Sequence, residues 1–393
     1  MTMSAEPTAR GRVLPIVAGL VLVLSLAVAG LLFFDRSPFN PLSGIPRAFP
    51  LHNLIFTLAA LVIGVLAVRR RRKVVIGMAL VAALVSGAAA IVPLQAQAET
   101  AEREHYLTSP GDYLRHGLQV NHGLPDRAKS VQYAAPGGHP LEMDIWPATN
   151  SGEGKAVLLI HGGAWREGTR GDTPEWNKLL NRLGYTVFDV DYRLLGEVPA
   201  GQAWEATVTD SKCALAWVTA NAEKYKINPD RISVMGQSAG GHLALMTAYS
   251  SGSGKLPPSC DLPEGKAKSV LDFYGPVDMV KFVTGPDGSD EGKQLLNAVL
   301  GGSLAEQEQR YRDFSPSSYF REGLPPTLIL QGTSDFLVPQ SQSHELQDRL
   351  TGLKVPNRAI YLPYTDHAFD LNWGAYPTQI ARQAVTEFLA ANG

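Results

Sequence analysis

The chain has 393 residues, 45% of them hydrophobic and 18% charged, and its formal net charge at pH 7 is −2. The charges are unevenly divided: residues 1–98 contain nine Lys and Arg against two Asp and Glu, and the remainder contains 26 against 35. Because the basic excess lies in an apolar region, this is not the charge distribution of a nucleic-acid-binding protein. The length allows two or three domains.

Three long apolar segments without a charged residue come first, at residues 13–34, 51–68 and 74–93. Each is about long enough to cross the ~30 Å hydrocarbon core of a bilayer as a helix. A helix is expected because a backbone in lipid must satisfy its own hydrogen bonds. A single such segment would also fit a buried helix or a signal peptide. Three in succession with short connections predict a membrane region over residues 1–98, with the bilayer as its partner.

Basic residues predict how these spans are oriented. Arg10 and Arg12 precede the first span, and five consecutive basic residues, 69–73, separate the second from the third. Because cytoplasmic loops carry the excess of Lys and Arg, the N-terminus and residues 69–73 are predicted to be cytoplasmic. We therefore expect a multi-pass protein of the cell membrane in which the chain after residue 93 is extracytoplasmic.

Ala96-Gln97-Ala98 has the small-x-small form of a signal-peptidase site. Cleavage there would release the rest of the chain from the membrane. We favour the alternative, in which the chain is not cleaved and stays anchored. The two cysteines, Cys213 and Cys260, leave it open whether a disulfide forms. No Cys-x-x-Cys or His-rich spacing is present, so no metal site is predicted.

Residues 99–129 are polar and read as a linker. From residue 130 to residue 393 short apolar runs alternate with amphipathic segments, which predicts a single domain with a mostly parallel sheet covered by helices on both faces. The predicted strands are residues 131–133, 141–146, 156–160, 186–190, 232–235, 269–274, 327–331 and 358–362. Helices are predicted near residues 204–225, 291–300, 340–350 and 379–390. A polar, Gly-rich stretch, 276–320, reads as an insertion lying over a site.

The pentapeptide Gly236-Gln237-Ser238-Ala239-Gly240 follows one predicted strand and precedes a helix-like apolar run. This context predicts a nucleophile elbow, a turn so tight that small residues are needed two positions either side of the serine. The turn lifts the serine hydroxyl clear of the sheet. It also directs the following backbone N–H groups toward a reacting carbonyl.

His161-Gly162-Gly163-Ala164-Trp165 directly follows the strand predicted at 156–160. Two glycines let the backbone turn back, so that its N–H groups face the serine and stabilise an oxyanion by roughly 3–4 kcal/mol each. On its own the motif would also fit a Gly-rich turn. We expect His161 to hold this loop rather than to transfer protons.

Asp335 and His367 each follow a predicted strand, after residues 327–331 and 358–362. Ligands of open α/β sheets gather at the carboxyl ends of the strands, and Ser, Asp, His is the chain order expected of an α/β-hydrolase. His367 is therefore predicted to accept the proton of Ser238, with Asp335 fixing the imidazole tautomer. Asp366 is the less favoured partner of His367, because an immediate neighbour usually points elsewhere.

Four further titratable residues are predicted to lie outside the reaction. His344 is expected on a helix surface, and His242 in a structural role beside the serine, although lining the pocket floor is an alternative. Asp191 and Arg193 are predicted to form a structural charge pair.

Six motifs agree in order and spacing with a known family: HGGAW, DYRL, GQSAGGHLA, FYGPVD, GTSD and DHAF. Over residues 130–393 the chain resembles the α/β-hydrolase esterases of the hormone-sensitive-lipase and feruloyl-esterase-like groups. The resemblance implies hydrolysis of carboxylic esters through an acyl-serine intermediate without a cofactor. It also implies that the oxyanion donors are the backbone N–H groups of Gly163, Ala164 and Ala239. Ala164 stands where the HGGG form has glycine.

Two other functions stay open from the sequence. Amide hydrolysis by the same fold is one, because the HGG-x-W loop occurs in both kinds of enzyme. A non-catalytic binding module is the other, but such domains typically lose a member of the triad. The substrate is not predicted beyond a small-molecule or lipid-like ester.

Overall fold

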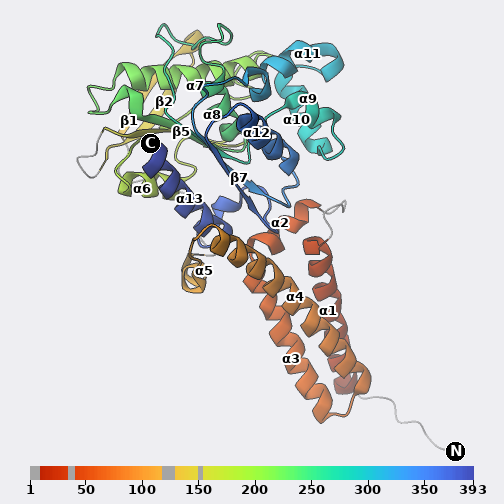
Figure 1. Ribbon diagram of the computed structural model, residues 1–393. Helices are drawn as coiled ribbons and strands as arrows, with labels where there is room; N and C mark the ends of the chain where they lie inside the picture. Colours follow the sequence, from red (N-terminus) through yellow and green to blue (C-terminus); the bar gives the residue numbers. More distant parts are fainter. Residues whose placement is uncertain (1–8, 34–39, 117–128, 149–153) are drawn as a thin grey trace, which may run out of the picture. The chain divides into compact units, whose positions relative to one another are not determined.

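The computed structural model describes residues 9–33, 40–116, 129–148 and 154–393. Their contacts divide the chain into two compact units (Figure 1). The first comprises Met1–Ser109 with Pro363–Asp366, and the second Pro110–Leu362 with His367–Gly393. Of the linker predicted over residues 99–129, residues 117–128 lie outside the described residues.

The first unit is a bundle of apolar helices. Its elements are α1 (Ala9–Phe33), α2 (Asn40–Ala48), the 3₁₀ turn η1 (Pro50–Asn53), α3 (Leu54–Arg69) and α4 (Lys73–Arg103). The long helix α4 packs against both α1 and α3. Small residues such as Ala67 and Ala79 are buried between the helices, and Thr57 and Ser86 share a hydrogen bond of 2.9 Å between α3 and α4. Small residues and hydroxyl links of this kind let helices pack closely in lipid.

Three of these helices are long and apolar enough to cross a membrane, over Val13–Phe33, Pro50–Arg69 and Lys73–Arg103. Large apolar side chains point away from the bundle, among them Leu58, 63% exposed, and Leu84, 73% exposed. Soluble proteins rarely expose a continuous surface of this kind. Helix α4 continues ten residues past the span predicted to end at residue 93, so Ala96-Gln97-Ala98 lies within a helix.

The second unit is built on one eight-stranded sheet, with strand order β1-β2-β4-β3-β5-β6-β7-β8. The strands are β1 (Lys129–Ala134), β2 (Leu141–Trp146), β3 (Ala156–Ile160), β4 (Thr186–Val190), β5 (Ile232–Gln237), β6 (Val270–Phe273), β7 (Thr327–Gly332) and β8 (Asn357–Leu362). Only the first two pairings, β1–β2 and β2–β4, are antiparallel; those from β4 to β8 are parallel. The strands β3 and β5 are buried along their whole length, as expected of a central sheet covered on both faces.

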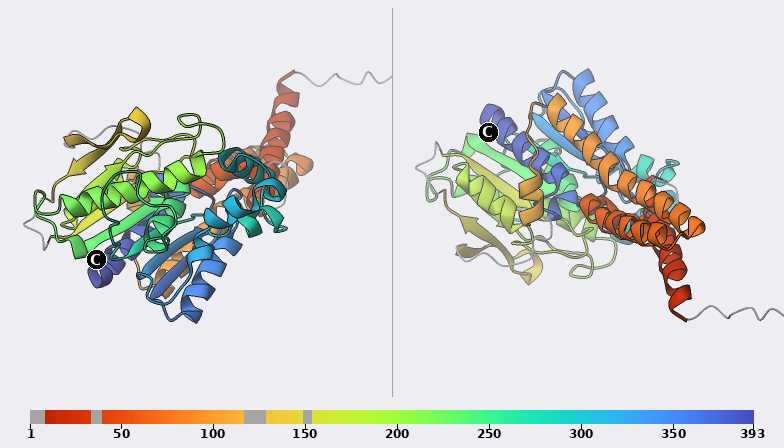
Figure 2. Two further views of the ribbon diagram at one scale, coloured as in Figure 1. Left: turned by 90° about the horizontal axis from the view of Figure 1, so that it is seen from above. Right: turned by 90° about the horizontal axis from the view of Figure 1, so that it is seen from below.

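Helices cover both faces of this sheet: α7 and α8 lie on one face and α6 and α13 on the other (Figures 1 and 2). The helices of the unit are α5 (Pro110–His116), α6 (Pro174–Arg182), α7 (Ala203–Ala220), α8 (Ala239–Tyr249), α9 (Met279–Thr284), α10 (Asp290–Leu300), α11 (Leu304–Asp313), α12 (Gln340–Gly352) and α13 (Tyr376–Asn392). Short 3₁₀ turns are η2 (Pro136–Gly138), η3 (Pro229–Arg231), η4 (Pro316–Tyr319) and η5 (Phe369–Leu371).

All eight predicted strands are present, and no strand end differs from its predicted position by more than two residues. The segment predicted as an insertion, 276–320, is largely helical, since it holds α9, α10, α11 and η4. Ser289 caps α10 by accepting a hydrogen bond from the N–H of Gly292 at 3.1 Å, and Ser303 and Glu306 form a capping box on α11. Of these helices, only α10 is predicted by the sequence.

The two cysteines form a disulfide, Cys213–Cys260, whose Cα atoms are 5.6 Å apart. It joins the buried helix α7 to the loop before β6. The sequence left open whether these two cysteines pair, and the structure shows that they do.

Candidate active site

The carboxyl ends of β3, β5, β7 and β8 bring together the segments that the sequence analysis singled out. Ser238 follows β5 and Asp335 follows β7, whereas His367 lies five residues after the end of β8. Because these strands run parallel to one another in one sheet, their carboxyl ends lie along the same edge of the sheet.

Ser238 occupies a strained turn between β5 and α8, with φ 56° and ψ −120°. The glycines around it are required by close backbone contacts. A Cβ at Gly236 would lie 2.2 Å from the carbonyl oxygen of Gly240, and a Cβ at Gly240 would lie 2.1 Å from that of Ile160. The predicted tight turn is therefore present, and the strain is maintained by the packing around it.

His367 lies between the serine and the aspartate. Its Nε2 is 2.8 Å from Ser238 Oγ, and its Nδ1 is 2.7 Å from Asp335 Oδ2. A carboxylate only accepts hydrogen bonds, so Nδ1 carries a proton and Nε2 is left to accept the hydroxyl proton of the serine. The three predicted side chains thus form one hydrogen-bonded chain, and the partner of Nδ1 is Asp335 rather than Asp366.

Backbone N–H groups hold Asp335 in place. Its Oδ1 accepts hydrogen bonds from the N–H of Leu337 at 2.9 Å and of Val338 at 2.8 Å, and Gln331 Nε2 donates to Oδ2 at 3.2 Å. The carboxylate is fully buried, whereas the imidazole of His367 is 10% exposed. A fixed, buried carboxylate can orient the imidazole and stabilise its charged form.

The loop after β3 lies against Ser238. A Cβ at Gly162 would be 3.6 Å from the Cβ of Ser238. The next two residues have left-handed backbone conformations, with φ 107° at Gly163 and 56° at Ala164. The turn is closed by the N–H of Glu167, which donates to the carbonyl of Gly163 at 2.9 Å.

Across from this loop, the backbone N–H of Ala239 belongs to the first turn of α8. N–H groups of a first helical turn have no partner within the helix, and the helix dipole favours negative charge there. The arrangement therefore suits the stabilisation of an oxyanion next to Ser238.

His161 is buried behind the loop and does not reach the serine. Its Nδ1 lies 2.6 Å from the carbonyl oxygen of Gly162, and its ring stacks on Tyr192 with the ring centres 4.4 Å apart. Burial lowers the pKa of His161, which favours the neutral ring. These contacts agree with the predicted structural role.

His242 binds the side chain of Trp165, which belongs to the loop after β3. The indole Nε1 donates to His242 Nδ1 at 3.2 Å, so His242 Nε2 is protonated and donates to the carbonyl of Phe314 at 2.7 Å. Burial lowers the pKa of His242 from 6.5 to about 3, partly offset by that carbonyl. The ring is therefore neutral at ordinary pH, and the favoured structural role is the one found.

Tyr274 and Asp370 were not singled out by the sequence analysis. The ring of Tyr274 lies 4.6 Å from that of His367, and its hydroxyl donates to Asp370. Trp176 Nε1 also donates to Asp370, at 2.8 Å. Burial raises the pKa of Asp370, against the lowering effect of these hydrogen bonds. FYGPVD contains Tyr274, and Asp370 directly follows DHAF. No sequence pattern joins the two residues, which are 96 positions apart.

One predicted pairing is wrong. Asp191 binds Arg170, which also contacts Glu142 and Asp144. Arg193 instead makes a bidentate pair with Asp210 on α7, with both distances at 2.8 Å. The side chains of Asp191 and Arg193 therefore have different charged partners. His344, as predicted, is exposed, and it stacks on Tyr361.

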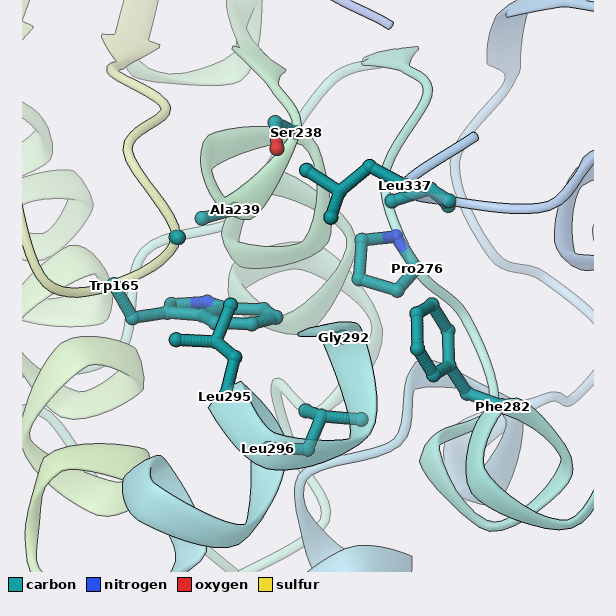
Figure 3. A pocket seen from close by; sticks show the side chains of 11 residues that line it. Trp165, Ser238, Ala239, Pro276, Phe282, Gly292, Leu295, Leu296 and Leu337 are labelled. Atoms are coloured by element: carbon teal, nitrogen blue, oxygen red, sulfur yellow. The ribbon is translucent and has the colours of Figure 1, made fainter. Parts of the chain in front are cut away.

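Two cavities open at Ser238. The larger has a volume of about 650 Å³ and is lined by Ser238, His367 and polar residues that include Gln237, Glu167 and Glu291. The smaller is about 20 Å³ and almost wholly apolar, with Trp165, Phe282 and Leu296 in its wall (Figure 3). Within the part of the chain that the structure describes, no cluster of three or more His, Cys, Asp or Glu side chains is arranged to bind a metal ion.

Comparison with known proteins agrees with this geometry. A protein-family model, BD-FAE, matches residues 143–350. "Probable carboxylic ester hydrolase LipM" of Mycobacterium tuberculosis is 31% identical over 263 residues, 64% of this chain and 58% of that protein. "Esterase LipQ" of the same species is 28% identical over 310 residues, 76% of this chain and 69% of that protein. The chain thus spans about three fifths to two thirds of the length of these relatives.

Solved structures show the same fold. Est2 of Thermogutta terrifontis with bound propionate, described as a thermophilic esterase, superposes on this chain with a TM-score of 0.56 at 22% sequence identity. The match covers 68% of this chain and 94% of the Est2 chain. A truncated carbohydrate esterase from gut microbiota superposes on this chain with a TM-score of 0.57 at 24% sequence identity. The match covers 69% of this chain and 99% of that esterase chain. The second unit therefore has the predicted α/β-hydrolase fold.

The neutral, buried state of His242 predicts a pH-dependent contribution to stability. Unfolding exposes the imidazole, which then binds a proton below its ordinary pKa of 6.5, whereas the folded ring stays neutral down to about pH 3. The neutral ring of His242 therefore contributes to the free energy of unfolding above pH 6.5, and this contribution is lost progressively as the pH falls below 6.5. Thermal unfolding of the full chain and of a His242→Gln variant between pH 7 and pH 4 tests this. We expect the difference between the two melting temperatures to narrow as the pH falls; a constant difference would contradict the assignment.

Proposed function

The chain belongs to the BD-FAE family, and we propose that it is a serine carboxylesterase that hydrolyses carboxylic esters through an acyl-serine intermediate. The observation that carries the proposal is His367, hydrogen-bonded to Ser238 on one side and to Asp335 on the other. An ordinary hydroxyl is a weak nucleophile at neutral pH, and an adjacent oriented base is what activates it.

The geometry supports a two-step reaction. Ser238 Oγ attacks the ester carbonyl while His367 Nε2 accepts the hydroxyl proton, and Asp335 stabilises the resulting imidazolium. The backbone N–H groups of Gly163, Ala164 and Ala239 bind the oxyanion. When the tetrahedral intermediate collapses, the C–O bond to the alcohol breaks and His367 gives its proton to the leaving oxygen. Water, deprotonated by His367, then attacks the acyl-serine and releases the acid.

Ester hydrolysis is preferred over amide hydrolysis, the alternative that the sequence left open. The relatives that match most of the second unit are named as esterases or ester hydrolases. The complete hydrogen-bonded chain also argues against a non-catalytic binding module.

Replacing Ser238 by Ala tests the proposal. We expect kcat on p-nitrophenyl acetate to fall by roughly 10⁴-fold or more, because the attacking oxygen is removed. Asp335→Asn should lower kcat by about 10⁴-fold, since the amide favours the wrong tautomer of His367. Asp366→Asn serves as the matched control and should retain kcat. Substantial hydrolysis by the Ser238→Ala enzyme would refute the assignment. Equal losses of kcat in Asp335→Asn and Asp366→Asn would also refute it.

We further propose that the three apolar helices anchor the enzyme in the cell membrane and that its second unit is extracytoplasmic. The concentration of basic residues at 69–73 and the outward-facing apolar side chains support this. The Cys213–Cys260 disulfide supports it independently, because disulfides persist mainly in oxidising compartments.

Fractionation of cells that express the chain with a C-terminal tag tests the location. We expect the full-length protein in the membrane fraction, and its second unit to be degraded when a protease is added outside the cytoplasmic membrane. A soluble product that lacks the residues up to Ala98 would instead show release by cleavage. Protection from the external protease until the membrane is lysed would contradict the orientation.

A further inference from the structure

The two cavities at Ser238 differ in which catalytic group they contact. Ser238 lines both of them, but His367 lines only the larger one. On the proposed function, on which this inference rests, His367 must give its proton to the leaving oxygen of the alcohol. The alcohol part of the ester therefore belongs in the larger cavity, and the acyl part belongs in the smaller cavity, which we call the acyl pocket.

The acyl pocket is small and apolar. Its volume of about 20 Å³ has room for little more than one water-sized group, and a methyl group is of that size. Leu295 and Leu296 line it from α10, and Phe282 lines it from α9 (Figure 3). All three belong to the segment 276–320, which the sequence predicts to lie over a site.

Much of this wall is fixed by packing. The side chains of Phe282 and Leu296 are buried. A Cβ at Gly292 would lie 2.6 Å from the ring of Phe282, so α9 and α10 already touch at this point. Trp165 is held by its hydrogen bond to His242. These residues can therefore move outward to admit a longer acyl chain only with a loss of packing.

Leu295 differs from these residues because it also borders the larger cavity. Four residues line both cavities: Ala164, Ser238, Leu295 and Leu337. Ser238 is the nucleophile, and Ala164 belongs to the loop with the proposed oxyanion donors. The N–H of Leu337 donates to Asp335. Leu295 lies on α10, outside these catalytic segments, and its side chain is half-buried. It therefore separates the two cavities at a position where it can be changed without altering the reacting groups.

We propose that Leu295 is a specificity-determining residue that closes the acyl pocket, so that the enzyme prefers esters of acetic acid to esters of longer acids. The methyl group of an acetyl ester fits the pocket, whereas a longer chain overlaps the side chain of Leu295. Forcing extra methylene groups into a filled apolar site is unfavourable. Shortening Leu295 joins the pocket to the larger cavity, whose volume is about 650 Å³, and gives a longer chain room to extend.

The p-nitrophenyl esters of acetic acid and hexanoic acid test this, because they share the alcohol and differ only in the length of the acyl chain. We expect the full-length enzyme to favour the acetate by roughly tenfold or more in kcat/KM. Leu295→Ala should lose this preference, because the hexanoyl chain can then enter the larger cavity. Leu304→Ala is the matched control and should keep the preference of the unmodified enzyme. Leu304 lies in the same segment and is likewise half-buried, but it lines neither cavity.

Labelling by a fluorophosphonate separates failure of this inference from failure of the proposed function. An unmodified enzyme that is labelled and hydrolyses both esters equally well overturns this inference and leaves the proposed function standing. Failure of both labelling and hydrolysis overturns the proposed function, and this inference with it. A labelled Leu295→Ala enzyme that keeps the preference for acetate shows that Leu295 does not set the acyl length, and so does an equal loss of preference in Leu304→Ala. If Leu295→Ala is not labelled, Leu295→Val is measured in its place and should weaken the preference in the same direction.

Discussion

The close approach of three backbone segments beneath Ser238 is the constraint on which the site depends. Gly240 at the start of α8 lies against the carbonyl of Ile160 at the end of β3, and no Cβ fits between them. This contact forces the turn that gives Ser238 its positive φ. It also places the loop that begins at His161 beside the serine. One steric requirement thus sets the position of the serine oxygen and of the N–H groups proposed to bind the oxyanion.

Buried polar side chains keep this arrangement rigid. His242 is neutral and joins Trp165 to the backbone at Phe314, and Asp335 is fixed by two backbone N–H groups. Each of these groups is satisfied by a specific partner, as buried polar groups in a well-specified core are expected to be.

Much of the second unit was predictable because its signals are local. Apolar runs predicted the eight strands, and Ser238, Asp335 and His367 could be identified because each follows such a run in the expected order. The contacts that were missed join distant parts of the chain. Trp165 and His242 are 77 residues apart, and Tyr274 and Asp370 are 96 apart. The disulfide likewise depends on how α7 packs, since two cysteines can pair only where their Cα atoms come within about 7 Å.

The identity of the residue that carries the acyl group is the most direct test of the account. The full-length enzyme would be treated with a fluorophosphonate, digested, and analysed by mass spectrometry of its peptides. We expect one adduct per chain, on the peptide that contains Ser238, and we expect it to form much more slowly when His367 is replaced by Ala. An adduct on a different residue, or ester hydrolysis that continues after Ser238 has been fully modified, would contradict this assignment.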